Sequence, residues 1–262
     1  MQTLDQLLQK PGTIFGTHIT IPHSSVVESM AMAGVAYLII DRQHVAQNLE
    51  TAERLIRDCK ANGLTPFVRT LDQSPALIGE AFDIGAAAVI VPGIETREQA
   101  EKSVSAARYG PRGTRSACPF VPQAGLNTPD WKGHVGNHND GCGIFALVET
   151  RKGINNIEEI ANVPGVRGLM AGVVDLSVDM GCDGNTTHSD VLAAVSRAVK
   201  AASANGKEFL KGVHTVDEDA AATIISDNAK LGVRLFWLGN PTLFLQQAAT
   251  RSLASAKKVK TA

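Results

Sequence analysis

Residues 34–44 of the chain read GVAYLIIDRQH, in which an apolar run ends in an acid and a histidine follows three residues later. A near-continuous apolar run such as VAYLII (35–40) is typical of a strand that is buried on both faces, as in a parallel sheet. A buried strand does not by itself need Asp41 and His44 at the place where it ends. The stretch therefore predicts a parallel sheet, and with it a group of functional side chains at the carboxyl edge of that sheet.

Similar apolar runs recur along the chain, and helix-like segments lie between them. The candidate strands are residues 13–20, 35–41, 65–70, 87–92, 143–149, 168–175, 209–215 and 233–239. Strands that alternate with helices predict a parallel sheet covered by helices. Eight such units in 262 residues predict the α/β class and a (β/α)8 or TIM barrel, as a single domain over residues 1–262.

Helix signals support this reading, and one stretch interrupts it. Residues 49–63 and 96–110 are amphipathic segments that each end at a glycine, and residues 189–206 form a longer one. Residues 110–142 are rich in Gly, Pro, Asn and His, and we expect a long loop there that covers the barrel mouth. A C-terminal helix is expected at about residues 241–257.

The composition excludes several classes of protein. The formal net charge of −1 gives no electrostatic basis for binding nucleic acid or an anionic membrane. No apolar run approaches the ~18 residues of a membrane helix, and the polar N-terminus is unlike a signal peptide. The four cysteines form no CxxC pair, so a zinc site or a disulfide scaffold is not expected. We expect a cytoplasmic protein.

Polar side chains stand at several of the predicted strand ends, where a barrel builds its active site. They are His18, Asp41, His44, Arg69, Glu149, Asp175 and His214. Glu149 and Asp175 are 26 residues apart, which places them on neighbouring strands about 4.8 Å apart. Two such carboxylates predict a divalent cation, Mg2+ or Mn2+ more than zinc. In the alternative reading, Asp175 caps the following helix and Glu149 pairs with an arginine.

Several of these motifs, taken in order, resemble one known family. DRQH (41–44), VRT (68–70), VPG (91–93), RYGPRGTR (108–115), VETR (148–151) and DLSVDMG (175–181) are similar to the HpcH/HpaI aldolases. The resemblance runs from about residue 12 to residue 250, and VETR and DLSVDMG are its most specific parts. These proteins are metal-dependent pyruvate aldolases of the phosphoenolpyruvate/pyruvate barrel superfamily.

The resemblance implies a role for each matching residue. Glu149 and Asp175 would bind the cation (Mg2+ or Mn2+, with Co2+ as a further candidate), and the cation would hold a pyruvate enolate. Arg69 would stabilise the enolate oxygen, and His44, oriented by Asp41, would move the proton of the aldol hydroxyl. The backbone at Gly172, Val173, Val174 and Asp175 would bind the pyruvate carboxylate. A hexamer with C-terminal helices between subunits is also implied.

Several positions depart from the family pattern, including Gly172-Val173-Val174-Asp175 where Gly-Pro-Ala-Asp is familiar. The family usually has a glutamate where Gln43 stands, and often a glutamine where Leu147 stands. The main functional hypothesis is an aldolase that splits a 4-hydroxy-2-oxo acid into pyruvate and an aldehyde. Two alternatives stay open: a lyase or synthase that acts on a thioester, and a non-catalytic barrel that binds a keto acid.

Four histidines have no role that the resemblance assigns. His134 and His138 have the spacing of a helical metal pair, but the glycines around them favour a solvated loop. His18 and His214 either contact the distal part of the substrate or are ordinary histidines at the barrel rim. Trp237 is expected to be a core residue of the last strand.

Overall fold

Eight parallel strands close into a barrel in the order in which they occur along the chain. The computed structural model describes residues 3–215 and 217–258. The strands are β1 (Ile14–Ile19), β2 (Tyr37–Asp41), β3 (Thr65–Arg69), β4 (Ala88–Val91), β5 (Gly143–Val148), β6 (Val166–Ala171), β7 (Glu208–Val213) and β8 (Leu235–Leu238). The predicted (β/α)8 fold is confirmed. Each strand begins within two residues of its predicted first residue.

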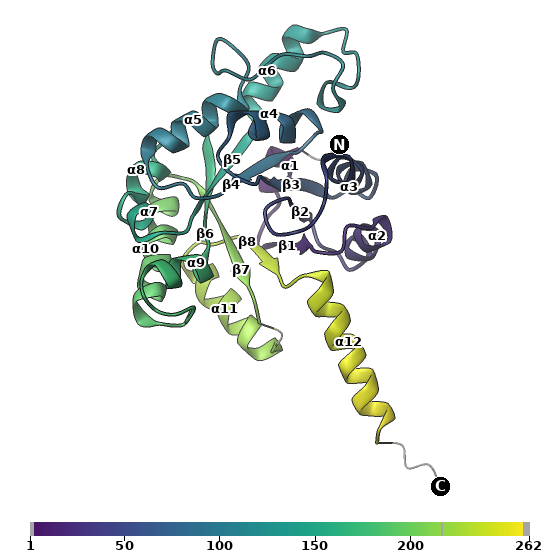
Figure 1. The fold of residues 1–262 in the computed structure, drawn as a ribbon, viewed down its shortest axis with the longest axis vertical. Helices are drawn as coiled ribbons and strands as arrows, with labels where there is room; N and C mark the ends of the chain where they lie inside the picture. Colours follow the sequence, from purple (N-terminus) through teal and green to yellow (C-terminus); the bar gives the residue numbers. More distant parts are fainter. Residues whose placement is uncertain (1–2, 216, 259–262) are drawn as a thin grey trace.

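Helices surround the barrel, as Figure 1 shows. They are α1 (Leu4–Leu8), α2 (Ser24–Met32), α3 (Leu49–Ala61), α4 (Pro75–Asp83), α5 (Arg97–Ala107), η1 (Pro122–Ala124), α6 (Trp131–Gly141), α7 (Arg151–Asn155), α8 (Ile157–Ala161), α9 (Val173–Asp179), α10 (Ser189–Ala204), α11 (Glu218–Lys230) and α12 (Pro241–Ala256). Among the described residues, no helix is long and apolar enough to span a membrane.

The barrel interior is filled by large side chains rather than left open. The rings of Tyr37, Phe67 and Phe145 lie against one another, with centroids 5.0 and 5.3 Å apart. Gly16 has no side chain because the Tyr37 ring passes 2.5 Å from the place where a Cβ would stand. Leu4, on α1, closes the amino-terminal end of this interior cluster. The open end, where a site can form, is therefore the carboxyl end.

The segment 110–142 does not cover the barrel mouth, so that expectation is wrong. It packs against the outer face of α4, where Arg115 forms an ion pair with Asp83 at 2.5 Å. Figure 1 shows α6 outside the helix ring, beyond α4 and α5. The reason is connectivity: a helix that follows a barrel strand returns the chain to the amino-terminal side, so this segment starts away from the mouth.

The expectation of a solvated loop at His134 and His138 is also wrong, because both residues lie on α6. Asp130 caps this helix by accepting a hydrogen bond from the Gly133 amide at 2.8 Å. His138 is buried, with its ring 2.6 Å from Arg115, and burial lowers its pKa to about 4. Capping and burial outweigh the poor helix propensity of the glycines. His138 thus packs against Arg115, and the His134 ring stacks on that of His138 with centroids 6.3 Å apart.

Strand β6 ends earlier than predicted, and this changes the setting of Asp175. The chain leaves the strand at Ala171, and Asp175 lies in the first turn of α9 rather than in the strand. Asp179, at the end of α9, accepts a hydrogen bond from the Arg151 amide at 2.6 Å. The short helix is thereby tied to the start of α7, on the neighbouring βα unit.

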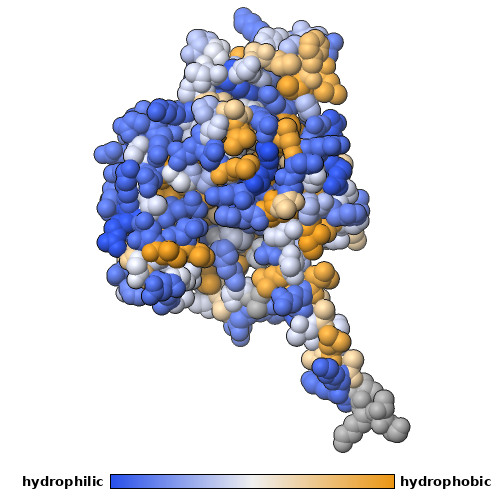
Figure 2. All heavy atoms as spheres, in the orientation of Figure 1, coloured by the Kyte–Doolittle hydropathy of each residue, from blue (hydrophilic) through white to orange (hydrophobic). Residues whose placement is uncertain are grey.

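The C-terminal helix α12 projects away from the barrel. It begins at Pro241 as predicted, and Leu245 and Leu253 are exposed along it. Figure 2 shows apolar side chains interspersed with polar ones on this projecting helix. A helix of this kind gains little from packing on its own barrel.

Candidate active site

Side chains alternate along a strand, and this alternation carries polar groups to the barrel mouth. On β2 the inward residues are Tyr37, Ile39 and then Asp41, and on β3 Phe67 is followed by Arg69. The same step places Glu149 just beyond β5. Each polar residue is therefore the next inward position after an apolar layer.

These groups surround a cavity of about 410 Å³ at the carboxyl ends of the strands. It is lined by His18, His44, Arg69, Glu149, Met170, Ala171, Gly172, Val173, Val174, Asp175, His214 and Trp237. All the site residues predicted from the sequence line this cavity except Asp41, which lies directly behind Arg69. The structure thus brings the predicted set together.

Asp41 and Arg69 form a buried ion pair. Arg69 donates from Nε to Oδ1 of Asp41 at 2.8 Å and from Nη2 to Oδ2 at 2.5 Å. Burial alone would raise the pKa of Asp41, but the hydrogen bonds and charge of Arg69 hold that pKa below its ordinary value. The two-point contact also fixes the plane of the guanidinium.

The contact between Asp41 and His44 differs from the one expected. Asp41 Oδ1 accepts the backbone N–H groups of Gln43 and His44 at 2.9 and 3.3 Å, and its remaining capacity is used by Arg69. The carboxylate therefore orients the loop that carries His44 rather than the imidazole itself. His44 is exposed and its ring faces the cavity.

Glu149 and Asp175 place two carboxylates in the same cavity. The pKa of Glu149 is raised, first by burial and then by the negative charge of Asp175. Gly172 lies so close that a Cβ there would stand 2.7 Å from Glu149 Oε1. A bound cation relieves the repulsion between two neighbouring carboxylates. The oxygen ligands of Glu149 and Asp175 therefore fit a hard divalent metal. The described residues offer no group of three or more His, Cys, Asp or Glu for a metal.

Gly93, which follows β4, supports the second oxygen of Glu149. Its amide donates to Glu149 Oε2 at 3.0 Å, and its carbonyl accepts a hydrogen bond from the Gln73 side chain. Gly93 has a φ of +67°, a conformation that glycine adopts without strain. Gly93 is a site residue that no residue pattern singled out, although it lies in the VPG motif of the resemblance.

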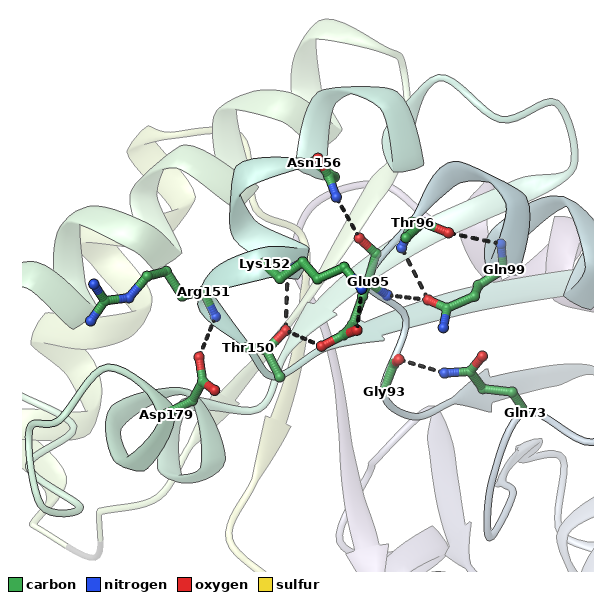
Figure 3. A network of polar contacts seen from close by, with 11 residues as sticks. Gln73, Gly93, Glu95, Thr96, Gln99, Thr150, Arg151, Lys152, Asn156 and Asp179 are labelled. Carbon is green, nitrogen blue, oxygen red and sulfur yellow. Dashed lines mark hydrogen bonds and ion pairs between the residues drawn. The ribbon is translucent and has the colours of Figure 1, made fainter.

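A polar network behind this loop, drawn in Figure 3, holds the β4–α5 and β5–α7 connections together. Glu95 accepts a hydrogen bond from the Thr150 hydroxyl at 2.9 Å and pairs with Lys152 at 3.0 Å. Its backbone carbonyl accepts from the Asn156 side chain at 2.8 Å. Because Thr150 directly follows Glu149, the network restrains the carboxylate through the backbone.

Two departures from the family pattern, Leu147 and Gln43, lie on different sides of Glu149. Leu147 is fully buried in the barrel interior, two residues before Glu149 on the same inward row. Gln43 lines a neighbouring hollow of about 470 Å³ that shares Glu149 with the main cavity. The interior below Glu149 is therefore apolar, and the hollow beside it carries an amide in place of an acid.

The chain belongs to the HpcH/HpaI aldolase/citrate lyase family, whose profile matches residues 15–235. The sequence-based recognition of this family is confirmed, and so is the prediction of a carbon–carbon lyase of the aldolase type.

One curated relative is the 2-dehydro-3,6-dideoxy-6-sulfogluconate aldolase of Pseudomonas putida, 34% identical over 86% of this chain and 91% of the relative. A family member from Burkholderia cenocepacia J2315 has a similar crystal structure, with a TM-score of 0.88, 26% identity and coverage of 97% and 98% of the two chains. A citrate lyase β subunit from M. tuberculosis, solved with oxaloacetate and magnesium, shares the fold at a TM-score of 0.60 and 20% identity, over 88% of this chain and 93% of its own.

Removal of Asp41 tests the buried ion pair. Asp41→Ala leaves the guanidinium of Arg69 buried without its partner, so we expect the free energy of unfolding to fall by about 3–5 kcal/mol. Asp140→Ala, which breaks the exposed ion pair with Arg112, is the matched control and should cost less than about 1 kcal/mol. Urea denaturation followed by circular dichroism measures both. Equal, small losses in the two variants would contradict a buried pair.

Proposed function

We propose that the protein is a divalent-metal-dependent aldolase that reversibly cleaves a 4-hydroxy-2-oxo acid into pyruvate and an aldehyde. The observation that carries this proposal is the meeting, in one cavity, of an uncompensated carboxylate pair with a fixed guanidinium and an accessible imidazole. These are the groups that stabilise a developing enolate and move a hydroxyl proton. Family membership supports the same reaction.

Glu149 and Asp175 would hold the metal, with Mg2+ or Mn2+ as the proposed ion. When bound, such a cation would polarise the keto group of the substrate and offset the negative charge that builds up on its oxygen. The chain supplies two carboxylates, so open positions would remain for the keto acid. The raised pKa of Glu149 beside Asp175 supports a cation between them.

Arg69 would stabilise the negative charge that develops on the keto oxygen. Its guanidinium is already fixed by the two hydrogen bonds to Asp41, so it needs little reorganisation during the reaction. We further propose that the pyruvate carboxylate lies against the backbone of Gly172, Val173, Val174 and Asp175, which lines the cavity at the start of α9.

His44 would take the proton of the C4 hydroxyl in the cleavage direction. As that O–H bond breaks, its electrons form the aldehyde C=O, and the C3–C4 bond breaks. The C3–C4 electron pair becomes the C2–C3 double bond of pyruvate enolate, which gains a proton at C3 to give pyruvate. In the synthetic direction the imidazolium returns the proton. An exposed imidazole at the mouth can exchange this proton with solvent.

We also propose that the enzyme works in the cytoplasm. Cys59, Cys118, Cys142 and Cys182 are all free thiols, which is the usual state in a reducing compartment. Fractionation of cells followed by immunoblotting tests this location.

His44→Ala should lower turnover in the cleavage direction by about 10²–10⁴-fold, the usual contribution of one acid–base group. Metal affinity should change little, because His44 is not among the proposed metal ligands. His188→Asn, at an exposed histidine that caps α10, is the control and should leave turnover unchanged. Coupling pyruvate release to lactate dehydrogenase gives the rate. Near wild-type turnover in His44→Ala would remove His44 from the mechanism.

Glu149→Gln should abolish Mg2+ binding and activity together, because an amide replaces one of only two carboxylates. Isothermal titration calorimetry measures metal binding, and Glu158→Gln, on the exposed face of α8, is the control. For the wild-type enzyme with Mg2+, proton NMR in deuterated water should show exchange at C3 of pyruvate, and EDTA should stop it.

The exchange reaction needs no aldehyde, so it isolates enolate formation from the choice of acceptor. Exchange that persists in EDTA would contradict the metal dependence. If the wild-type enzyme with Mg2+ shows no exchange, the protein is better described as a keto-acid-binding barrel.

We propose that the protein assembles as a hexamer through α12, whose exposed Leu245 and Leu253 project from the barrel. Light scattering should then give about six times the 27.7 kDa chain mass. The double variant Leu245→Lys/Leu253→Lys should shift the mass downward, and Leu192→Lys on α10 is the control. A monomeric wild-type protein would refute the assembly.

A further inference from the structure

Three aromatic rings form a wall on one side of the cavity. His18 on β1 stacks on Trp237 of β8 with centroids 4.4 Å apart, and His214, just after β7, meets Trp237 edge-on at 4.4 Å. Strands β7, β8 and β1 are consecutive in the closed barrel. Glu149 and Asp175 follow β5 and β6, so the wall stands on a different arc of the mouth from the proposed pyruvate site.

This wall is closely packed. His18 is 7% exposed and Trp237 is 5% exposed. Gly212 lies beneath the rings, and a Cβ at that position would stand 2.7 Å from His214 Nε2 and 2.7 Å from Trp237 Cζ2. The rings therefore occupy space that smaller residues would leave open. They set how far a substrate can extend toward β8.

The wall also lacks positive charge at neutral pH. Burial, and then the charge of Arg69, lower the pKa of His18 to about 3, so its ring is neutral. Desolvation, and then Lys211, place the pKa of His214 below its ordinary value. Among the described residues that line the cavity, Arg69 alone has a permanent positive charge, and it is already engaged by Asp41 and, in the proposed reaction, by the keto oxygen.

An anionic group placed against these rings would lose hydration without gaining a cationic partner, which is costly. The reacting carbon must lie near Arg69 and His44, which line this cavity and not the hollow that Gln43 lines. The part of this cavity that the wall bounds is then the space available to the remainder of the aldehyde half.

We propose that His18, Trp237 and His214 form the surface that selects the aldehyde, and that it selects a short aldehyde without a charged end. This inference rests on the proposed aldolase function and adds the substrate class. It sets the chain apart from its Pseudomonas relative, whose named substrate carries a sulfonate.

The wild-type enzyme with Mg2+ and pyruvate is first assayed on matched pairs of aldehydes. The kcat/KM for butanal should exceed that for succinic semialdehyde, its counterpart with a carboxylate end, by at least about tenfold. The kcat/KM for propanal should likewise exceed that for hexanal, because the wall limits length. A preference for succinic semialdehyde would overturn the proposed charge selection, and equal rates for propanal and hexanal would overturn the proposed size selection.

Two variants then change one property each. Trp237→Leu opens space, so the ratio of hexanal to propanal kcat/KM should rise about tenfold. Trp237→Phe removes less volume and should raise the same ratio by a smaller factor. It replaces Trp237→Leu in the test if that variant folds poorly. His214→Lys adds a cation at the rim and should move the ratio of succinic semialdehyde to butanal upward by about tenfold. Unchanged ratios would show that the aldehyde lies elsewhere, such as in the hollow at Gln43.

Pyruvate C3 exchange in deuterated water separates the two proposals. It does not involve the aldehyde, so exchange by the wild-type enzyme shows that the enolate forms, whichever aldehyde the enzyme accepts. If the wild-type enzyme shows exchange but the variants leave the kcat/KM ratios of the aldehydes unchanged, the proposed aldehyde surface is rejected and the aldolase proposal stands. Absence of exchange in the wild-type enzyme would reject both.

Discussion

Closure of the eight-stranded sheet forces every second side chain into one shared interior, and the rest of the structure follows from how that interior is filled. Tyr37, Phe67 and Phe145 fill it with mutually contacting rings, and Leu4 closes its amino-terminal end. The next inward positions have no apolar layer above them. Polar groups can stand there because they pair with each other, as the buried Asp41 and Arg69 do, or remain partly open to solvent, as Glu149 does. The packed interior beneath holds the backbone that carries them.

Two charge arrangements of opposite character share this mouth. The opposite charges of Asp41 and Arg69 compensate each other. The two hydrogen bonds between them hold the guanidinium in one orientation. Glu149 and Asp175 do not compensate each other, and the negative charge of Asp175 adds to the burial that raises the pKa of Glu149. One pair is complete within the chain, whereas the other is the pair for which we propose a bound cation. This division matches a site in which the chain provides orientation and a metal provides charge.

Several features of this arrangement were predictable from residue patterns alone. Apolar runs such as VAYLII and the helix signals between them indicated eight βα units, and the polar residues after each run indicated the face that carries the site. The motif resemblance added the family. Prediction was weaker where local propensity and burial disagreed: the glycines around His134 suggested a loop, but capping by Asp130 and packing of His138 on Arg115 produced a helix.

The sequence by itself determined the eight strands, their alternation with helices and the identity of the polar residues at the mouth, because periodicity and strand ends are local properties of the chain. Only the tertiary structure decided their partners. Asp41 contacts Arg69 rather than the imidazole of His44, and Gly93 supports Glu149 from a loop 56 residues earlier. Likewise, His18, Trp237 and His214 meet only because β8 closes on β1. Such contacts join residues far apart in the chain, and they depend on barrel closure and side-chain packing, which no local pattern records.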